Sequence, residues 1–314
     1  MIIIDGHCDA LFKMIENPSL DFFASDLSGL DVTYPRMCRS NIKVQFFAIY
    51  LSERIKNPRL DHYLEYAALF HRKIVSDGRI RAIRTRNDLE AVMRSGTERG
   101  ALLTLEGADA LHGNLLHLQT LYDLGVRMIG TTWNYANWAA DGILEPRQAG
   151  FTLQGKAFIK ACNELGMLLD ASHLSVRAFW DMAECSRKPF VATHSNAKAV
   201  CSHPRNLDDD QIRELIRAGG RIGITFVPWF VSHQGAAIDG IIKHIDHILS
   251  LGGAGSLALG SDFDGIDRWI PQLEHAGQFD RLAFELYKRY PDDVAEGILY
   301  GNWYSFLAEQ LPAR

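Results

Sequence analysis

The chain begins with IIIDGHCD (residues 2–9), a short apolar run that ends in a histidine and a carboxylate two positions apart. Residues i and i+2 of a β-strand point to the same side of a sheet, so His7 and Asp9 can reach one ion while Cys8 points away. Imidazole and carboxylate groups are common ligands of divalent metals. This stretch therefore predicts a strand with a candidate metal site at its carboxyl end, and the same pattern recurs along the chain.

Apolar runs rich in β-branched and aromatic residues predict eight short strands, and amphipathic stretches between them predict helices. The predicted strands are residues 2–7, 42–51, 101–106, 126–133, 167–173, 190–194, 221–227 and 257–262. The clearest helical patterns are residues 60–75, 114–124, 154–165, 208–218 and 240–251. This alternation, without a linker, predicts an α/β fold in which residues 1–314 form a single (β/α)8 barrel of the TIM type. A doubly wound open sheet is the alternative, but no Gly-rich phosphate loop follows the first strand.

Polar side chains stand at or just beyond the ends of the predicted strands. Examples are LLTLEG (102–107), LLDASH (168–173), FVATHS (190–195) and LALGSDFDG (257–265). In a barrel of parallel strands the carboxyl ends meet at one mouth, where the active sites of this fold are built. The sequence therefore predicts a metal site at that face, formed by His7, Asp9, Glu106, His173, His194 and Asp262.

Three carboxylates and three imidazoles are too many ligands for one tetrahedral zinc ion. Without a cation, the carboxylates of Asp9, Glu106 and Asp262 would be crowded together and partly desolvated, which costs roughly several kcal/mol for each unpaired ion. Two metal ions about 3.5–4 Å apart, sharing a bridging carboxylate, relieve this repulsion. The set therefore predicts a centre with two metals.

The composition narrows the possible partners and location of the protein. The 314 residues include 33 basic and 38 acidic side chains, with a net charge of −5, and no basic stripe predicts nucleic-acid binding. We expect no membrane-spanning helix, because no run of 18 apolar residues occurs, and we expect no secretory signal at the N-terminus. Five scattered cysteines predict a reduced, cytoplasmic protein with free thiols.

The motifs resemble those of the membrane dipeptidase (renal dipeptidase) family of zinc peptidases, which belongs to the metal-dependent hydrolase barrels. The resemblance spans nearly the whole chain. It rests on DGHCDAL (5–11), LEG (105–107), LDASHLS (169–175), THSNA (193–197), RNL (205–207), GSDFDG (260–265) and GN (301–302).

The resemblance implies two zinc ions per chain. By their place in the motifs, His7 and Asp9 correspond to ligands of one ion, and His173 and His194 to ligands of the other. Glu106 corresponds to the carboxylate that bridges both ions.

The resemblance also implies roles for residues outside the ligand set. Asp262 corresponds to the catalytic acid that handles protons, and Arg205 to the arginine that holds the C-terminal carboxylate of the substrate. Animal members place a histidine after threonine at the end of the fourth strand, whereas this chain carries Trp133 there. We therefore expect either Asn134 or a nearby group to contact the oxyanion of the substrate, or the metal alone to suffice.

The expected activity is hydrolysis of dipeptides, including those with a C-terminal D-residue, by a homodimer. A lipid anchor is not expected, because no apolar tail is present at the C-terminal end. Two alternatives stay open. One is another metal-dependent amidohydrolase acting on N-acyl amino acids, lactones or β-lactams at the same site. The other is a non-catalytic binding protein with a relic metal site.

Overall fold

Parallel strands form the centre of the molecule in the computed structural model, which describes residues 1–24 and 29–313. The strands pair in the order β6-β5-β4-β2-β1-β8-β7, and β3 pairs only with the beginning of β4. Their bounds are β1 Ile3–Asp5, β2 Ile42–Tyr50, β3 Ile80–Ala82, β4 Arg99–Glu106, β5 Val126–Gly130, β6 Leu168–Asp170, β7 Ile222–Ile224 and β8 Leu257–Leu259.

The gap between β6 and β7 is closed by a segment that the sequence analysis predicted as a regular strand. Residues 190–194 instead form two isolated parallel bridges, Val191 to Asp170 and Ala192 to Ile222. Beyond Ala192 the ladder is interrupted, because side chains of the neighbouring segment accept the next two backbone N–H groups. Thr193 N donates to the Asp170 carboxylate at 3.0 Å, and His194 N donates to the Ser172 hydroxyl at 3.3 Å. The barrel predicted from the sequence is thus confirmed, with the irregular segment 190–194 in place of a regular sixth strand.

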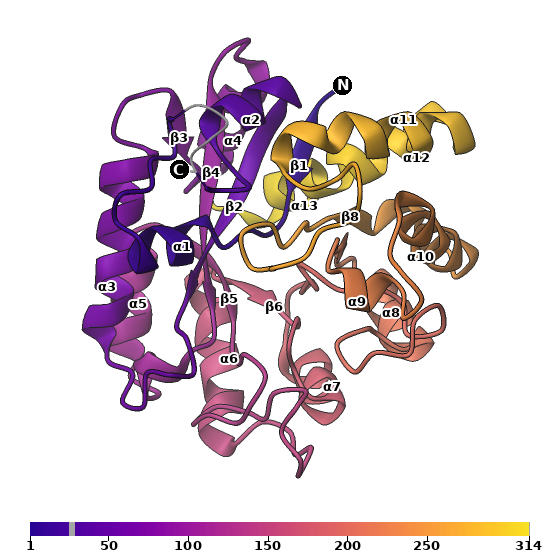
Figure 1. Ribbon diagram of the computed structural model, residues 1–314. Helices are drawn as coiled ribbons and strands as arrows, with labels where there is room; N and C mark the ends of the chain where they lie inside the picture. The colour runs from indigo at the N-terminus through magenta and orange to yellow at the C-terminus, as the bar shows by residue number, and fades with distance from the viewer. Residues whose placement is uncertain (25–28, 314) are drawn as a thin grey trace.

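Helices surround the strands on all sides, as Figure 1 shows. They are α1 Ala10–Glu16, α2 Tyr34–Arg39, α3 Leu60–Leu69, α4 Arg86–Arg94, α5 Leu115–Asp123, α6 Leu153–Leu165, α7 Val176–Cys185, α8 Asp209–Arg217, α9 Pro228–Val231, α10 Ile238–Ser250, α11 Phe279–Arg289, α12 Asp292–Glu296 and α13 Asn302–Gln310. None of the helices in residues 1–24 and 29–313 is both long enough and apolar enough to cross a membrane.

Helix α13 closes the end of the barrel opposite the site. Inward side chains of the strands, including Ile4, Phe46 and Leu102, form one apolar cluster with Trp303 and Phe306 of α13. The Trp303 indole also donates to the carbonyl of Leu259 at 2.8 Å, at the end of β8. One end of the barrel is therefore filled with apolar side chains, which leaves the polar residues at the other end.

A buried histidine in α10 supports the loop that carries His194. Nδ1 of His244 accepts the N–H of Ala197 at 3.1 Å, and its Nε2 lies 3.1 Å from the carbonyl of Val231. A neutral imidazole satisfies both contacts, since one nitrogen accepts while the other donates. Burial is the main reason why the pKa of His244 is lowered to about 4.

The lowered pKa of His244 predicts that the protein becomes less stable in acid. Between pH of about 6.5 and 4 the unfolded chain binds a proton that folded His244 does not, so we expect the free energy of unfolding to decrease as the pH falls through this window, by on the order of 2–3 kcal/mol. Urea unfolding at about pH 7.5 and 4.5 measures this loss. His244→Gln should lose less stability than the wild type over the same interval, and an identical loss would contradict the assignment.

Candidate metal centre

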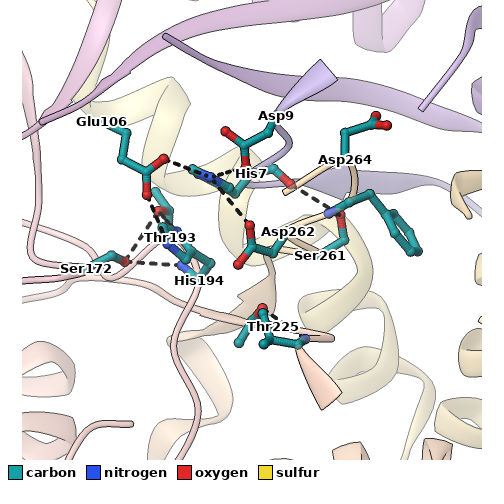
Figure 2. A network of polar contacts seen from close by, with 12 residues as sticks. His7, Asp9, Glu106, Ser172, Thr193, His194, Thr225, Ser261, Asp262 and Asp264 are labelled. Atoms are coloured by element: carbon teal, nitrogen blue, oxygen red, sulfur yellow. Dashed lines mark hydrogen bonds and ion pairs between the residues drawn. The ribbon is translucent and has the colours of Figure 1, made fainter. Parts of the chain in front are cut away.

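The six residues predicted from the sequence come together at the mouth of the barrel. Glu106 is the last residue of β4, and the others lie in the loops that follow their strands. The strands before His7, His173 and Asp262 end earlier than predicted, and the loops that follow them aim these side chains. Figure 2 shows Glu106 with His7 and Asp262 on one side and His194 below it. The His7 and His194 rings lie with their centroids 3.9 Å apart.

The two oxygens of Glu106 face two different groups of side chains. Oε2 lies 3.6 Å from Nε2 of His7. Oε1 lies 2.7 Å from Nε2 of His173 and 3.4 Å from Nε2 of His194. A carboxylate in this position can donate lone pairs to two ions at once, one on each side.

Asp9 and Asp262 complete the group around His7. Nε2 of His7 lies 3.4 Å from Oδ2 of Asp9 and 3.8 Å from Oδ1 of Asp262. Ligand atoms converge within 4.8 Å in two sets, His7 with Glu106 and His194, and His7 with Asp9 and Asp262. His7 belongs to both sets, and His173 lies next to His194 and Oε1 of Glu106. The six side chains therefore form two adjoining groups that meet at His7 and Glu106.

The electrostatics of the site are those of crowded, buried groups. Burial raises the pKa of Glu106 well above its usual value, and although His7 lowers it, Asp9 and Asp262 raise it further. Burial also raises the pKa of Asp262 to about 7. Burial alone would lower the pKa of His7, but the three carboxylates raise it to about 10. The three carboxylates thus favour a positive charge beside them, either on His7 or on a bound cation.

The donor chemistry fits a metal better than a proton. Nε2 of His7 and Oδ1 of Asp9 are buried and have no hydrogen-bond partner. Nε2 of His173 and Nε2 of His194 face each other at 2.9 Å. Burial, with smaller contributions from Arg205 and His7, lowers the pKa of both these imidazoles well below the usual value, so both are neutral, which is the form that can bind a metal. Neutral imidazoles and carboxylates that converge at a largely buried site are typical of transition-metal binding.

Backbone conformation aims two of these side chains. His173 has φ of 69° and Asp262 has φ of 66°, in the left-handed region that residues other than glycine rarely adopt. Gly265 then leaves the space that the carboxylates occupy, since a Cβ at this position would collide with Oδ2 of Asp9 and Oδ1 of Asp262. The GSDFDG motif is therefore a turn shaped around the two acids.

A cavity of about 840 Å³ opens above these side chains. Arg205 lies in it with 5% of its surface exposed, its guanidinium 5.5 Å from the Phe230 ring and its Nε without a partner. Asn134 and Trp133 also line the cavity, and Oδ1 of Asn134 lies 2.8 Å from Nδ1 of His173. The apolar walls are Phe12, Tyr50, Trp133, Val227, Trp229, Phe230 and Ile266.

Several buried polar residues that were not predicted from the sequence support the site. Asp5 in β1 accepts the N–H of Ser261 at 2.7 Å and its hydroxyl at 2.6 Å, next to Asp262. Asp170 at the end of β6 accepts three hydrogen bonds, from Ser172 N, Thr193 N and the Thr193 hydroxyl. An acidic residue inside an otherwise apolar strand, as in IIID and LLD, is the signal that could have indicated both carboxylates.

A parallel α/β barrel with clustered imidazoles and carboxylates at its mouth has the architecture of a metal-dependent hydrolase. The family model of membrane dipeptidase (peptidase family M19) matches residues 1–310, so the chain belongs to that family and is a metallo-dipeptidase.

Relatives and solved structures agree with this assignment. An uncharacterized protein from the pqqA 5′ region of Klebsiella pneumoniae is 36% identical over 241 residues, covering 73% of this chain and 88% of the relative. Dipeptidase aclJ of Aspergillus oryzae is 29% identical over 288 residues, covering 86% of this chain and 68% of the relative.

Two solved structures superpose over almost the whole chain. The M19 metallopeptidase named dipeptidase AC has a TM-score of 0.91 with 26% identity, covering 100% of this chain and 99% of that one. A metallopeptidase of Rhodobacter sphaeroides, liganded with a phosphinate mimic of L-Ala-D-Ala, has a TM-score of 0.90 with 25% identity and covers 99% of each chain.

Proposed function

We propose that this protein is a binuclear zinc dipeptidase whose ligands are His7, Asp9, Glu106, His173 and His194. The observation that carries this proposal is the position of Glu106, whose Oε2 faces His7 while Oε1 faces His173 and His194. A single metal would leave one of these oxygens and its neighbouring imidazole unused. The proposal extends to one barrel domain over residues 1–314. A homodimer, as the family resemblance implies, stays a prediction that light scattering tests.

The two zinc ions, when bound, would polarise the peptide carbonyl and supply a nucleophile from water at neutral pH. The protein groups around them then bind the substrate and move protons. Asp262 lies beside this centre, with Oδ1 3.8 Å from Nε2 of His7, and its side chain lines the cavity. It is placed to accept the proton of the attacking water and to pass it to the leaving amine.

Arg205 is proposed to bind the C-terminal carboxylate of the dipeptide. One of its nitrogens, Nη2, lies 3.3 Å from the carbonyl of His194, which holds the side chain next to the ligands. Its Nε has no partner and is buried, so a carboxylate entering the cavity would satisfy it. A clamp on the carboxylate this close to the metal ligands limits the substrate to one residue beyond the scissile bond.

Removal of this clamp should affect binding more than turnover. We expect Arg205→Ala to raise KM for free dipeptides about 10–100-fold, since a hydrogen bond to a charged group contributes about 1.5–3 kcal/mol. The measurement compares each dipeptide with its C-terminally amidated form. Wild type should discriminate strongly between the two and the variant should not. If the variant loses activity equally on both substrates, Arg205 does not hold the carboxylate.

The configuration of the C-terminal residue that the enzyme accepts is a separate part of the proposal. The Rhodobacter sphaeroides structure holds a mimic of L-Ala-D-Ala, and we propose that this chain also accepts a D-residue at the C-terminal position. The test measures zinc in the purified protein together with hydrolysis of paired L,L and L,D dipeptides. Two zinc ions per chain with cleavage of both isomers would support the proposal. A protein that binds zinc but cleaves neither isomer would overturn the proposed substrate.

A further inference from the structure

The proton on His173 is fixed by its neighbour in the loop after β5. Nδ1 of His173 lies 2.8 Å from Oδ1 of Asn134. A carboxamide oxygen only accepts hydrogen bonds, so Nδ1 must carry the proton. In a neutral imidazole Nε2 is then unprotonated, and Nε2 is the atom that lies 2.7 Å from Glu106. Asn134 therefore turns the ligating lone pair of His173 toward the metal centre.

The proton on His194 is fixed by a chain of two residues. The Thr193 hydroxyl donates to Oδ2 of Asp170 at 2.5 Å, which uses its only proton. The same hydroxyl oxygen lies 2.8 Å from Nδ1 of His194, so it can only accept there and Nδ1 must donate. Figure 2 shows Thr193 beside His194 at this position. Asp170 cannot rotate away easily, because its other oxygen accepts from Ser172 N and Thr193 N at 2.9 and 3.0 Å.

The same tautomer on both rings has one consequence at the centre. Two unprotonated Nε2 atoms then face each other at 2.9 Å, and both face Oε1 of Glu106. Three lone pairs directed at one point repel each other unless a cation lies between them.

We propose that Asn134, and Asp170 acting through Thr193, are positioning residues that lock His173 and His194 in the Nδ1–H tautomer so that both present Nε2 to one zinc ion. This inference rests on the proposed metal centre and not on the identity of the substrate. Hydrogen-bond partners of metal-binding histidines orient the ring and fix its tautomer in many sites, and their loss typically weakens metal binding about 10–100-fold.

Two pairs of variants separate this role from a merely structural one. Asn134→Leu removes the acceptor at similar size, while Asn134→Asp keeps an acceptor that cannot donate. Thr193→Val removes the hydroxyl at similar shape, while Thr193→Ser keeps it. The conservative member of each pair should therefore keep the wild-type tautomer of the ring that it contacts.

The first measurement is the tautomer itself, in the metal-free full chain. Long-range ¹H–¹⁵N spectra of the imidazoles, assigned with His173→Gln and His194→Gln, should show both rings as Nδ1–H in the wild type. Asn134→Leu and Thr193→Val should shift the affected ring toward the other tautomer. Unchanged spectra in both of these variants would overturn the proposal.

The second measurement is zinc affinity, by competition with a chelator and without any peptide. We expect zinc binding to weaken about 10–100-fold in Asn134→Leu and Thr193→Val. It should stay near the wild-type value in Thr193→Ser and should not fall below it in Asn134→Asp, whose added negative charge favours a cation. Equal weakening in both members of a pair would also overturn it. Neither measurement uses a dipeptide, so both can be interpreted even if the proposed substrate is wrong. A protein that binds zinc but cleaves no dipeptide would contradict the proposed substrate and not this inference.

Discussion

Asp262→Asn should lower kcat for dipeptide hydrolysis about 10²–10⁴-fold while leaving the zinc content unchanged, because the carboxamide keeps the size of the side chain but cannot accept a proton. Asp262 follows β8 in a turn with φ of 66°, and its Oδ1 lies 3.8 Å from Nε2 of His7, in the same set of ligand atoms as Asp9. The proposed zinc ligands are five other side chains, all of which Asp262→Asn keeps. Loss of this carboxylate should therefore lower kcat without lowering the zinc content.

Asp267→Asn is the matched control for this experiment. Asp267 lines the same cavity five positions further along the chain, but it is exposed. The control carries the same change of charge at the rim, so a general electrostatic effect on substrate binding would appear in both variants. Near-wild-type turnover in Asp262→Asn with full zinc content would show that another group moves the proton.

The sequence was sufficient to predict the barrel and the residues at its mouth, because each of these signals is local. The run LLTLEG predicts a buried strand and places Glu106 at its end, whichever residues surround it. The structure confirms that position at the end of β4. The rule that the carboxyl ends of parallel strands share one face then brings side chains together that are far apart in sequence.

The rest depended on contacts between distant segments. Trp303 of α13 packs against inward side chains of the barrel and donates to the carbonyl of Leu259, partners that no local pattern indicates. The irregular segment 190–194 has a strand-like composition, yet Asp170 and Ser172 replace part of its backbone ladder. From the sequence, Asn134 is predicted only as a substrate contact. The structure shows that its Oδ1 contacts Nδ1 of His173, while its role in substrate binding stays a prediction.

The loss of Glu106 should have the largest effect of any single substitution in this protein. Glu106→Gln replaces the carboxylate that faces both groups of ligands, and an amide nitrogen would then point at one of them. We expect zinc to fall from two ions per chain to one or fewer and turnover to fall further than in Asp262→Asn, since both the positioning of the ions and their charge balance are lost.

Thermal unfolding with and without zinc distinguishes this role from simple damage to the fold. In the metal-free protein, burial raises the pKa of Glu106, and the charges of Asp9 and Asp262 raise it further, so the neutral amide should leave the metal-free Tm equal or higher. Zinc should raise the Tm of the wild type by mass action, because it binds only the folded site, and should raise that of Glu106→Gln far less. Glu16→Gln, at an exposed glutamate that lines the same cavity, is the control and should respond to zinc like the wild type. A Glu106→Gln protein that still binds two zinc ions and gains the full increase in Tm would show that the two groups of ligands do not share this carboxylate.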